Sequence, residues 1–234
     1  MLKTAVYGFL RVSFDLLPQP QLGWGAAVLA IAAVTGLFGA VFAAVQTDMK
    51  RLLAYSSIEN IGIIFSGLGL ALLYRAMGMD KLCAIALAAS IYHCFNHSQF
   101  KSLLFLATGS VLHATGQRSL GKLGGLIHQM PWVAGLALVG TLAMAGLPPL
   151  NGFVSEWLLL QSYLITPTLP HALFNMLVPL SAAAFALTVA LAAYVLVKFY
   201  GVIFLGRSRE PQLAPARDAN TLERIGLAWL AMIC

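Results

Sequence analysis

The chain has 234 residues, of which 60% are hydrophobic and 9% charged, and its mean hydropathy is +0.85. Soluble domains carry about 25% charged residues, so the composition predicts an integral membrane protein and excludes an ordinary soluble enzyme. The net charge of +6 is interpreted as a property of membrane-protein loops, since no basic-aromatic patch indicates a nucleic-acid partner. The three cysteines form no Cys-x-x-Cys pair, so we predict neither a disulfide framework nor a metal or other cofactor.

Apolar windows separated by charges, prolines and glycines predict the membrane helices. The expected spans are 2–17, 23–46, 52–73, 82–113, 131–163, 172–205 and 221–234. The first reaches only ~24 Å at ~1.5 Å per residue, against a hydrocarbon core of ~30 Å. The last is also short and is still apolar at its final residue. We therefore expect a chain that begins and ends inside membrane helices of a longer polytopic protein.

Alternate loops between these spans differ in charge. One set carries Lys50, Arg51, Arg118, Lys122, Arg207, Arg209 and Arg217. The other carries Arg75 and Lys81, with Asp80 between them. Because cytoplasmic loops are enriched in lysine and arginine, we expect the first set on the cytoplasmic side. Lys198, near the end of its span, is expected to extend its ammonium toward the same interface.

Two ionisable residues near the start of the first and third spans each have two interpretations. Lys3 is either an anchor at the membrane interface or, if the helix continues upstream, a buried group. Glu59 lies about two turns into the third span. It is either an interfacial carboxylate paired with Arg51 or Lys50, or a buried acid at membrane depth. Asp48, just before that span, is expected to cap it.

The fourth span contains three ionisable groups at regular spacing. His93, His97 and Lys101 follow one another every four residues, so they share one helix face and climb ~12 Å along it. Such groups are costly toward lipid, and a row of them predicts a proton relay. The histidine spacing also suits a zinc pair. However, no third ligand is evident and Lys101 would repel a cation, so we predict no metal.

The fifth span is interrupted by Pro148 and Pro149. Two consecutive prolines remove two backbone donors, so the sequence predicts two half-helices with a break at 147–151. Irregular backbone at membrane depth must be buried in protein or line a water-filled cavity. Glu156 lies about two turns past the break, and an acid near a broken helix is typical of transporter ion sites. The alternative is a packing kink with Glu156 paired to a neighbouring helix.

Three segments together resemble a known family. They read TDMKRLLAYSSIENIG, HCFNHSQFKSLLFLATGSVLHATG with LGKLGGL, and LAMAGLPPLNGFVSEWLLL. This combination resembles the antiporter-like membrane subunits shared by respiratory complex I, Mrp cation/proton antiporters and membrane-bound hydrogenases. The Glu59-Asn60 pair and the segment around Glu156 are most similar to the large antiporter-like subunit of hydrogenase-4 and formate hydrogenlyase.

The resemblance implies an all-α, polytopic transmembrane helix bundle. The chain would be the second inverted repeat of the antiporter-like fold, with one discontinuous helix, and would span roughly helices eight to fourteen of the family. Residues 1–17 would then be a truncated transmembrane helix and 18–206 the five-helix repeat. Residues 207–220 would form a cytoplasmic loop and 221–234 a second truncated helix.

The resemblance also implies a central hydrophilic axis. Lys3 matches a helix-eight lysine that links two half-channels. His97 and Lys101 match the histidine and lysine of helix eleven on this axis, and His93 lies one turn away. These roles are implied by the family and not by spacing alone.

Two acids complete the implied path. Glu156 matches an ionisable residue of the broken helix, which faces an exit half-channel. Asn60 occupies a position that is histidine in some relatives, so Glu59 is expected to substitute for it in proton transfer. The glutamate and lysine pair of the family's first repeat is absent from this sequence.

The function implied is proton translocation in a redox-driven complex of the hydrogenase-4, formate hydrogenlyase or complex I type. The chain would be a subunit without its own redox centre and without a cofactor. Its expected partners are other membrane subunits, a peripheral redox arm, the lipid bilayer and protons or sodium ions, in a bacterial or archaeal cytoplasmic membrane. The alternatives are a subunit of a Mrp-type cation/proton antiporter, a structural membrane anchor and a membrane zinc enzyme.

Overall fold

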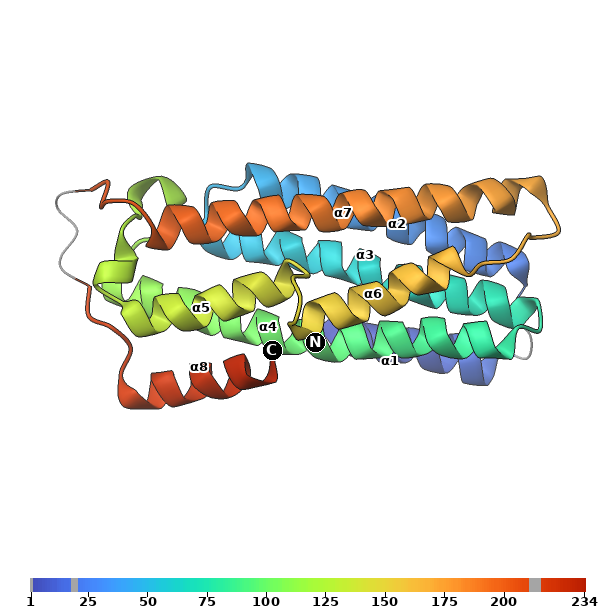
Figure 1. Ribbon diagram of the computed structural model, residues 1–234, viewed down its shortest axis with the longest axis horizontal. Coiled ribbons are helices and arrows are strands. Elements are labelled where there is room, and N and C mark those ends of the chain that lie inside the picture. The colour runs from blue at the N-terminus through green and yellow to red at the C-terminus, as the bar shows by residue number, and fades with distance from the viewer. Residues whose placement is uncertain (1, 18–20, 211–215) are drawn as a thin grey trace.

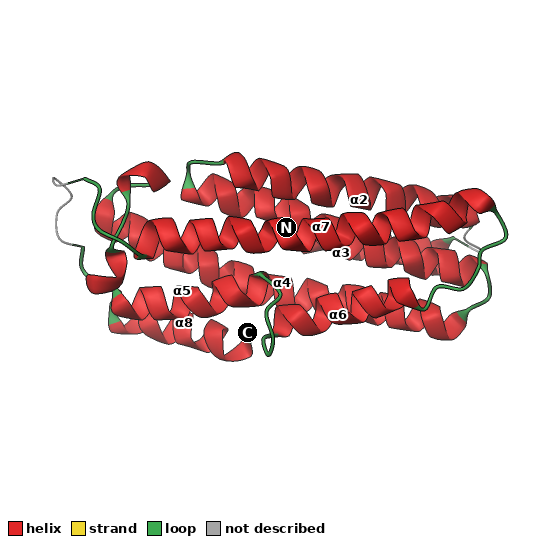
Figure 2. Ribbon diagram, turned by 45° about the horizontal axis from the view of Figure 1, so that its top comes forward, coloured by secondary structure: helices red, strands yellow, loops and turns green. Residues whose placement is uncertain are grey.

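The computed structural model describes residues 2–17, 21–210 and 216–234, which form an elongated bundle of helices (Figure 1). The helices are α1 (Leu2–Leu10) with a π-helical continuation (Arg11–Leu16), α2 (Leu22–Val45), α3 (Met49–Ala76), α4 (Asp80–Thr115), α5 (Pro131–Met144), α6 (Asn151–Leu164), α7 (Ala172–Phe204) and α8 (Thr221–Ile233). Short 3-10 turns at Leu120–Lys122 and Leu126–His128 precede α5. Within the described ranges the only extended pairing is one bridge between Asp48 and Ser119, so the predicted all-α class is confirmed (Figure 2).

The expected spans correspond to these helices, with the fifth divided into α5 and α6. The first changes from α-helical to π-helical geometry at Arg11, which forms a 2.6 Å ion pair with Asp15. The expected connections at 18–22 and 207–220 include residues 18–20 and 211–215, which lie outside the described part of the chain. The division of the chain into one repeat with flanking helices stays a prediction.

Within the described part of the chain, α2, α3 and α7 are long and apolar enough to cross a membrane. The α4 helix has 36 residues, which corresponds to about 54 Å at the usual rise. Large apolar side chains on α2 and α7 point outward, including Ile31 at 68% exposure and Val197 at 71%. Large exposed apolar side chains on long apolar helices suit contact with lipid tails and not with water.

Glycines allow α2 and α3 to pack closely. A Cβ at Gly39 would overlap the backbone of Glu59, and a Cβ at Gly62 would overlap the backbone of Gly36. Small residues permit such close approach between membrane helices. This contact holds the backbone of Glu59 directly against α2 in the interior of the bundle.

The break between α5 and α6 lies beside the end of α8 (Figure 1). Gly146 has a φ of 65°, a left-handed conformation that glycine adopts without strain, and Pro148–Pro149 follow it. At the start of α6 the backbone N–H of Asn151 donates to the Cys234 carbonyl at 2.7 Å. The Asn151 Nδ2 donates to the Ile233 carbonyl at 3.2 Å. The predicted discontinuous helix is confirmed, and the end of α8 is bonded to the half-helix that follows the break.

Asp48 caps α3 as expected. Its Oδ1 accepts bonds from the backbone N–H groups of Lys50 at 2.9 Å and Arg51 at 3.0 Å. Its other carboxylate oxygen lies 3.6 Å from Nε of Arg118, and the N–H of Met49 donates to the Arg118 carbonyl at 3.0 Å. The loops before α3 and after α4 therefore meet at one end of the bundle, which agrees with their assignment to one set of loops.

Lys198 extends its ammonium to the end of α2 where the loop before α3 begins, and its place at the membrane interface stays a prediction. Its Nζ donates to the carbonyls of Ala44 at 2.7 Å and Gln46 at 3.0 Å, at the C-terminal end of α2. The last carbonyls of a helix lack partners within the helix and carry partial negative charge. The ammonium therefore caps α2 and joins α7 to it, because a helix end lies within its reach.

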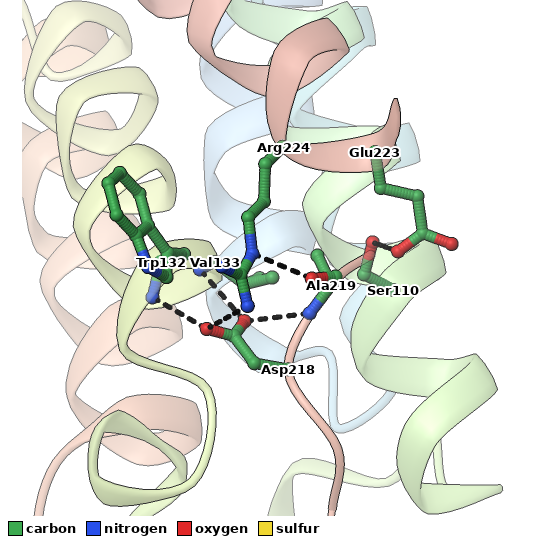
Figure 3. Close-up of polar contacts among 7 residues, drawn as sticks. All are labelled: Ser110, Trp132, Val133, Asp218, Ala219, Glu223 and Arg224. Atoms are coloured by element: carbon green, nitrogen blue, oxygen red, sulfur yellow. Dashed lines mark hydrogen bonds and ion pairs between the residues drawn. The ribbon is translucent and has the colours of Figure 1, made fainter. Parts of the chain in front are cut away.

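Asp218 joins the N-terminal ends of α5 and α8 (Figure 3). Its carboxylate accepts bonds from the backbone N–H groups of Trp132 at 3.1 Å and Val133 at 3.4 Å. Arg224 lies 3.6 Å from the same carboxylate, donates to the Ala219 carbonyl at 2.7 Å and stacks over the Trp132 ring. A carboxylate at a helix N-terminus is favourable, so this cluster holds α8 beside α5.

Candidate functional site

The row of ionisable side chains on α4 faces the interior of the bundle. His93, His97 and Lys101 are 1%, 4% and 5% exposed. Their immediate neighbours come from α3 and from α6, the half-helix that follows the break. The α4 face predicted from the sequence is therefore enclosed by protein.

Lys101 is held by neutral acceptors on α3. Its Nζ donates to the Leu53 carbonyl at 2.8 Å and to the Ser56 hydroxyl. The Ser56 hydroxyl in turn donates to the same Leu53 carbonyl at 3.1 Å. No carboxylate lies within 4.0 Å of Nζ in the described ranges. Dipoles therefore stabilise the buried Lys101 side chain without the support of a direct ion pair.

His93 bridges α3 and α6. Its Nε2 lies 3.1 Å from Oδ1 of Asn60 on α3, and its Nδ1 lies 2.9 Å from Oγ of Ser155 on α6. Both ring nitrogens therefore have protein partners. Among the described residues, no three histidine, cysteine or acidic side chains gather in a way that could hold a metal ion.

Asn96 and His97 occupy the next part of the row, opposite the start of α6. The Asn96 Nδ2 donates to the Asn151 carbonyl at 2.8 Å and to Oγ of Ser155 at 3.1 Å. The Asn96 Oδ1 and both ring nitrogens of His97 are buried without a hydrogen-bond partner in the described protein. Buried polar atoms of this kind are usually bonded to ordered water.

Glu59 is buried on α3 at 1% exposure, and neither carboxylate oxygen has a protein hydrogen-bond partner among the described residues. It forms no ion pair with Lys50 or Arg51, so the interpretation as an interfacial carboxylate is wrong. Residues three apart on a helix share a face, which places Glu59 one turn from the Ser56 hydroxyl that binds Lys101.

Lys3 points into the protein from α1. Its Nζ is buried and has no hydrogen-bond partner among the described side chains. It lines a cavity of about 110 Å³ together with Ser90 and Cys94 of α4. The interpretation of Lys3 as an exposed interfacial anchor is therefore not supported, and its ammonium lies beside the α4 helix that carries the row.

Glu156 lies on α6, in the second turn after the break, and is 8% exposed. Its carboxylate contacts Gly146 so closely that a Cβ at this glycine would overlap Oε2. No ion pair to Glu156 is found in the described part of the chain, so the alternative of a paired packing residue is not supported. The break and the acid therefore form one local arrangement.

The segment 1–177 matches the model of the family described as "NADH:quinone oxidoreductase/Mrp antiporter, TM". The chain belongs to this family. The resemblance inferred from its motifs is confirmed. The chain is 41% identical over 234 residues to formate hydrogenlyase subunit 3 of Escherichia coli K12. This match covers 100% of the chain and 38% of that protein. It is 35% identical over 236 residues to hydrogenase-4 component B of the same organism, covering 100% of the chain and 35% of that protein.

A solved structure has the same fold as this family member. The structure of the membrane-bound sulfane sulfur reductase, an archaeal respiratory membrane complex, contains a chain that matches with a TM-score of 0.80 and 30% sequence identity. The match covers 99% of the present chain and 36% of that chain. The predicted antiporter-like transmembrane bundle is therefore confirmed. The chain spans well under half the length of the relatives and the structure that it matches.

Several polar residues of this antiporter-family chain are missed by sequence reasoning. Ser56, Asn96 and Ser155 bond directly to the ionisable groups or to one another, and each is less than 2% exposed. Serine and asparagine are common in membrane helices as packing residues, so their identity alone does not mark a site. Their position in the sequence could have indicated them, because Ser155 directly precedes Glu156 and Asn96 directly precedes His97.

Proposed function

We propose that this chain moves protons within the membrane as part of a redox-driven complex of the hydrogenase-4, formate hydrogenlyase and complex I type. The observation that carries the proposal is the enclosed row of His93, His97 and Lys101 on α4, flanked by Glu59 on α3 and Glu156 on α6. Ionisable groups inside membrane proteins are expensive, and they occur mainly where ions or protons pass.

We expect the proton route to follow these contacts across the bundle. Lys101 binds Ser56, which lies one turn from Glu59, and His93 binds Ser155, which directly precedes Glu156. His97 lies between them on α4, about 6 Å from each neighbour along the helix axis. Its ring nitrogens and the Glu59 oxygens have no protein partners among the described residues, so we expect water to connect them.

Charge would control the direction of transfer. A proton on Lys101 disfavours a second proton on His97, because like charges repel strongly in a medium of low dielectric constant. An ionised Glu156 has the opposite effect and favours a proton nearby. Gain or loss of one proton therefore changes the affinity of the next group for a proton. Lys3, beside its cavity against α4, is proposed as the connection to the missing half of the path.

The partners are proposed from the relatives. Hydrogenase-4 component B and formate hydrogenlyase subunit 3 are named as components of larger assemblies, and the matching solved structure is a respiratory membrane complex. We propose that this chain likewise assembles with other membrane subunits and a peripheral redox arm. The arm would supply the energy in a bacterial or archaeal cytoplasmic membrane.

A second function is a subunit of a Mrp-type cation/proton antiporter, because the family description covers both classes. The same buried groups would then exchange a proton for sodium or potassium without a redox partner. An imposed sodium gradient that drives proton movement across vesicles, with no redox substrate added, would favour this alternative over the redox-driven complex.

The test is Lys101→Ala in the assembled complex, reconstituted in liposomes that report proton uptake with a pH-sensitive dye. We expect proton movement to fall by about tenfold or more, which corresponds to ~1.4 kcal/mol or more on the transfer barrier. The matched control is Lys198→Ala, which removes another lysine that donates to backbone carbonyls; Lys198 lies on α7 and binds the end of α2 but none of the proposed path residues. Equal proton movement in both variants would refute the proposal and would favour a structural anchor.

A further inference from the structure

The tautomer of His93 follows from its partner on α3. The Asn60 Nδ2 donates to the Ser56 carbonyl at 2.8 Å, which orients the Asn60 amide so that its oxygen faces His93. An amide oxygen only accepts hydrogen bonds, so Nε2 of His93 carries a proton in this arrangement. The other ring nitrogen, Nδ1, is therefore the one that can gain or lose a proton.

Ser155 faces this variable nitrogen and has several choices of partner. Its oxygen lies 2.9 Å from Nδ1 of His93 and accepts a bond from Asn96 Nδ2 at 3.1 Å. The same hydroxyl can donate to the Gly152 carbonyl at 3.0 Å or the Asn151 carbonyl at 3.4 Å. A hydroxyl has one proton and two lone pairs, so these contacts define two complete arrangements.

In the first arrangement His93 is neutral. The Ser155 hydroxyl donates to Nδ1 of His93 and accepts from Asn96. In the second arrangement Nδ1 is protonated and donates to Ser155. The Ser155 oxygen then accepts two bonds, one from His93 and one from Asn96, and its proton turns to the Gly152 carbonyl. In both arrangements the two ring nitrogens of His93, the Ser155 hydroxyl and the Asn96 amide nitrogen all have partners, which matters because these side chains are buried.

We propose that Ser155 is a positioning residue whose hydroxyl rotates between His93 and the Gly152 carbonyl, so that the buried His93 can take up and release a proton at Nδ1. On uptake the Nδ1–H bond forms and an O–H or N–H bond of the donor, a water molecule or an ionisable side chain, breaks; on release both changes reverse, and Ser155 carries one proton before and after. The proton comes from, and leaves to, a neighbouring group of the path. This inference rests on the proposed function and adds a residue to it. It also joins the α4 row to the half-helix after the break, one residue before Glu156.

Ser155→Ala tests the inference, with Ser162→Ala as the matched control. Both serines lie on α6 and are 0% exposed, but among the described residues the Ser162 hydroxyl donates only to the Leu158 carbonyl of its own helix. The first readout is nitrogen-15 NMR of the assembled complex labelled at histidine, with the His93 signal identified by its loss in His93→Gln. We expect Ser155→Ala to shift the Nδ1 resonance of His93, whereas Ser162→Ala leaves it unchanged.

The second readout is proton uptake by liposomes that contain the complex. We expect Ser155→Ala to slow proton movement by about tenfold, because protonated His93 then lacks an acceptor at Nδ1. An unchanged Nδ1 resonance, or proton movement equal to that of Ser162→Ala, would overturn the inference. If Lys101→Ala blocks proton movement and Ser155→Ala does not, this inference fails while the proposed function stands. Normal proton movement in Lys101→Ala would instead overturn both.

Discussion

The contact between Gly146 and Glu156 allows the role of the helix break in proton movement to be tested separately from its role in stability. Gly146→Ala adds a methyl group at a φ of 65°, where an L-residue costs about 1–2 kcal/mol. The new Cβ would also overlap Oε2 of Glu156. Ordinary van der Waals contact begins at 3.4 Å. The carboxylate would therefore have to move by about 1 Å, a displacement that can slow a positioned reaction by as much as about 100-fold.

Gly116→Ala is the matched control for this change. Gly116 ends α4 with a φ of 67°, and a Cβ there would meet nothing within 4 Å. Both variants should lose similar stability, measured as the thermal denaturation of the purified complex. Only Gly146→Ala should impair proton uptake, by about 10- to 100-fold. If the two variants transport protons equally well, the position of the Glu156 carboxylate does not matter and our reasoning about the break is refuted.

Two further predictions concern the packing that positions the site. Gly39→Ala should destabilise the complex by about 1–3 kcal/mol, because the added methyl group meets the rigid backbone of Glu59. The control, Gly135→Ala, has open space around the added methyl group and should stabilise the complex by about 0.5–1 kcal/mol. Denaturation of the two variants measures this difference, and equal stability would contradict the close α2–α3 contact. Asp218→Ala should cost about 0.5–2 kcal/mol by removing the carboxylate at the start of α5, and an unchanged denaturation midpoint would contradict that capping role.

Much of the fold follows from one-dimensional patterns. Runs of apolar residues predict the long helices, and Pro148–Pro149 predict the division of the fifth span, because these features act locally. The buried face of α4 is also predictable, since the spacing of His93, His97 and Lys101 places them together. The observed helix ends differ from the predicted ones by a few residues where a capping residue such as Asp48 lets the helix begin before the apolar run.

The partners of the site residues could not be predicted, because they depend on contacts between distant segments. The sequence permits two interpretations of Glu59, as an interfacial carboxylate in an ion pair or as a buried acid. Only the packing of α2 against α3 shows that the side chain is buried. Lys198 has an ordinary position near a helix end, and its bonds to the end of α2 join residues 154 and 152 positions apart, so they require the relative placement of two helices. Ser155 becomes informative only when it is seen beside the ring of His93, and the bond between Asn60 and the same ring likewise requires the structure.

The central claim is that protons pass along the enclosed row of α4. Its most direct test is the number of protons moved per electron transferred in liposomes that contain the Lys101→Ala complex. We expect this number to fall sharply while the Lys198→Ala complex keeps the value of the unsubstituted complex. An unchanged number in Lys101→Ala, with electron transfer intact, would contradict the account.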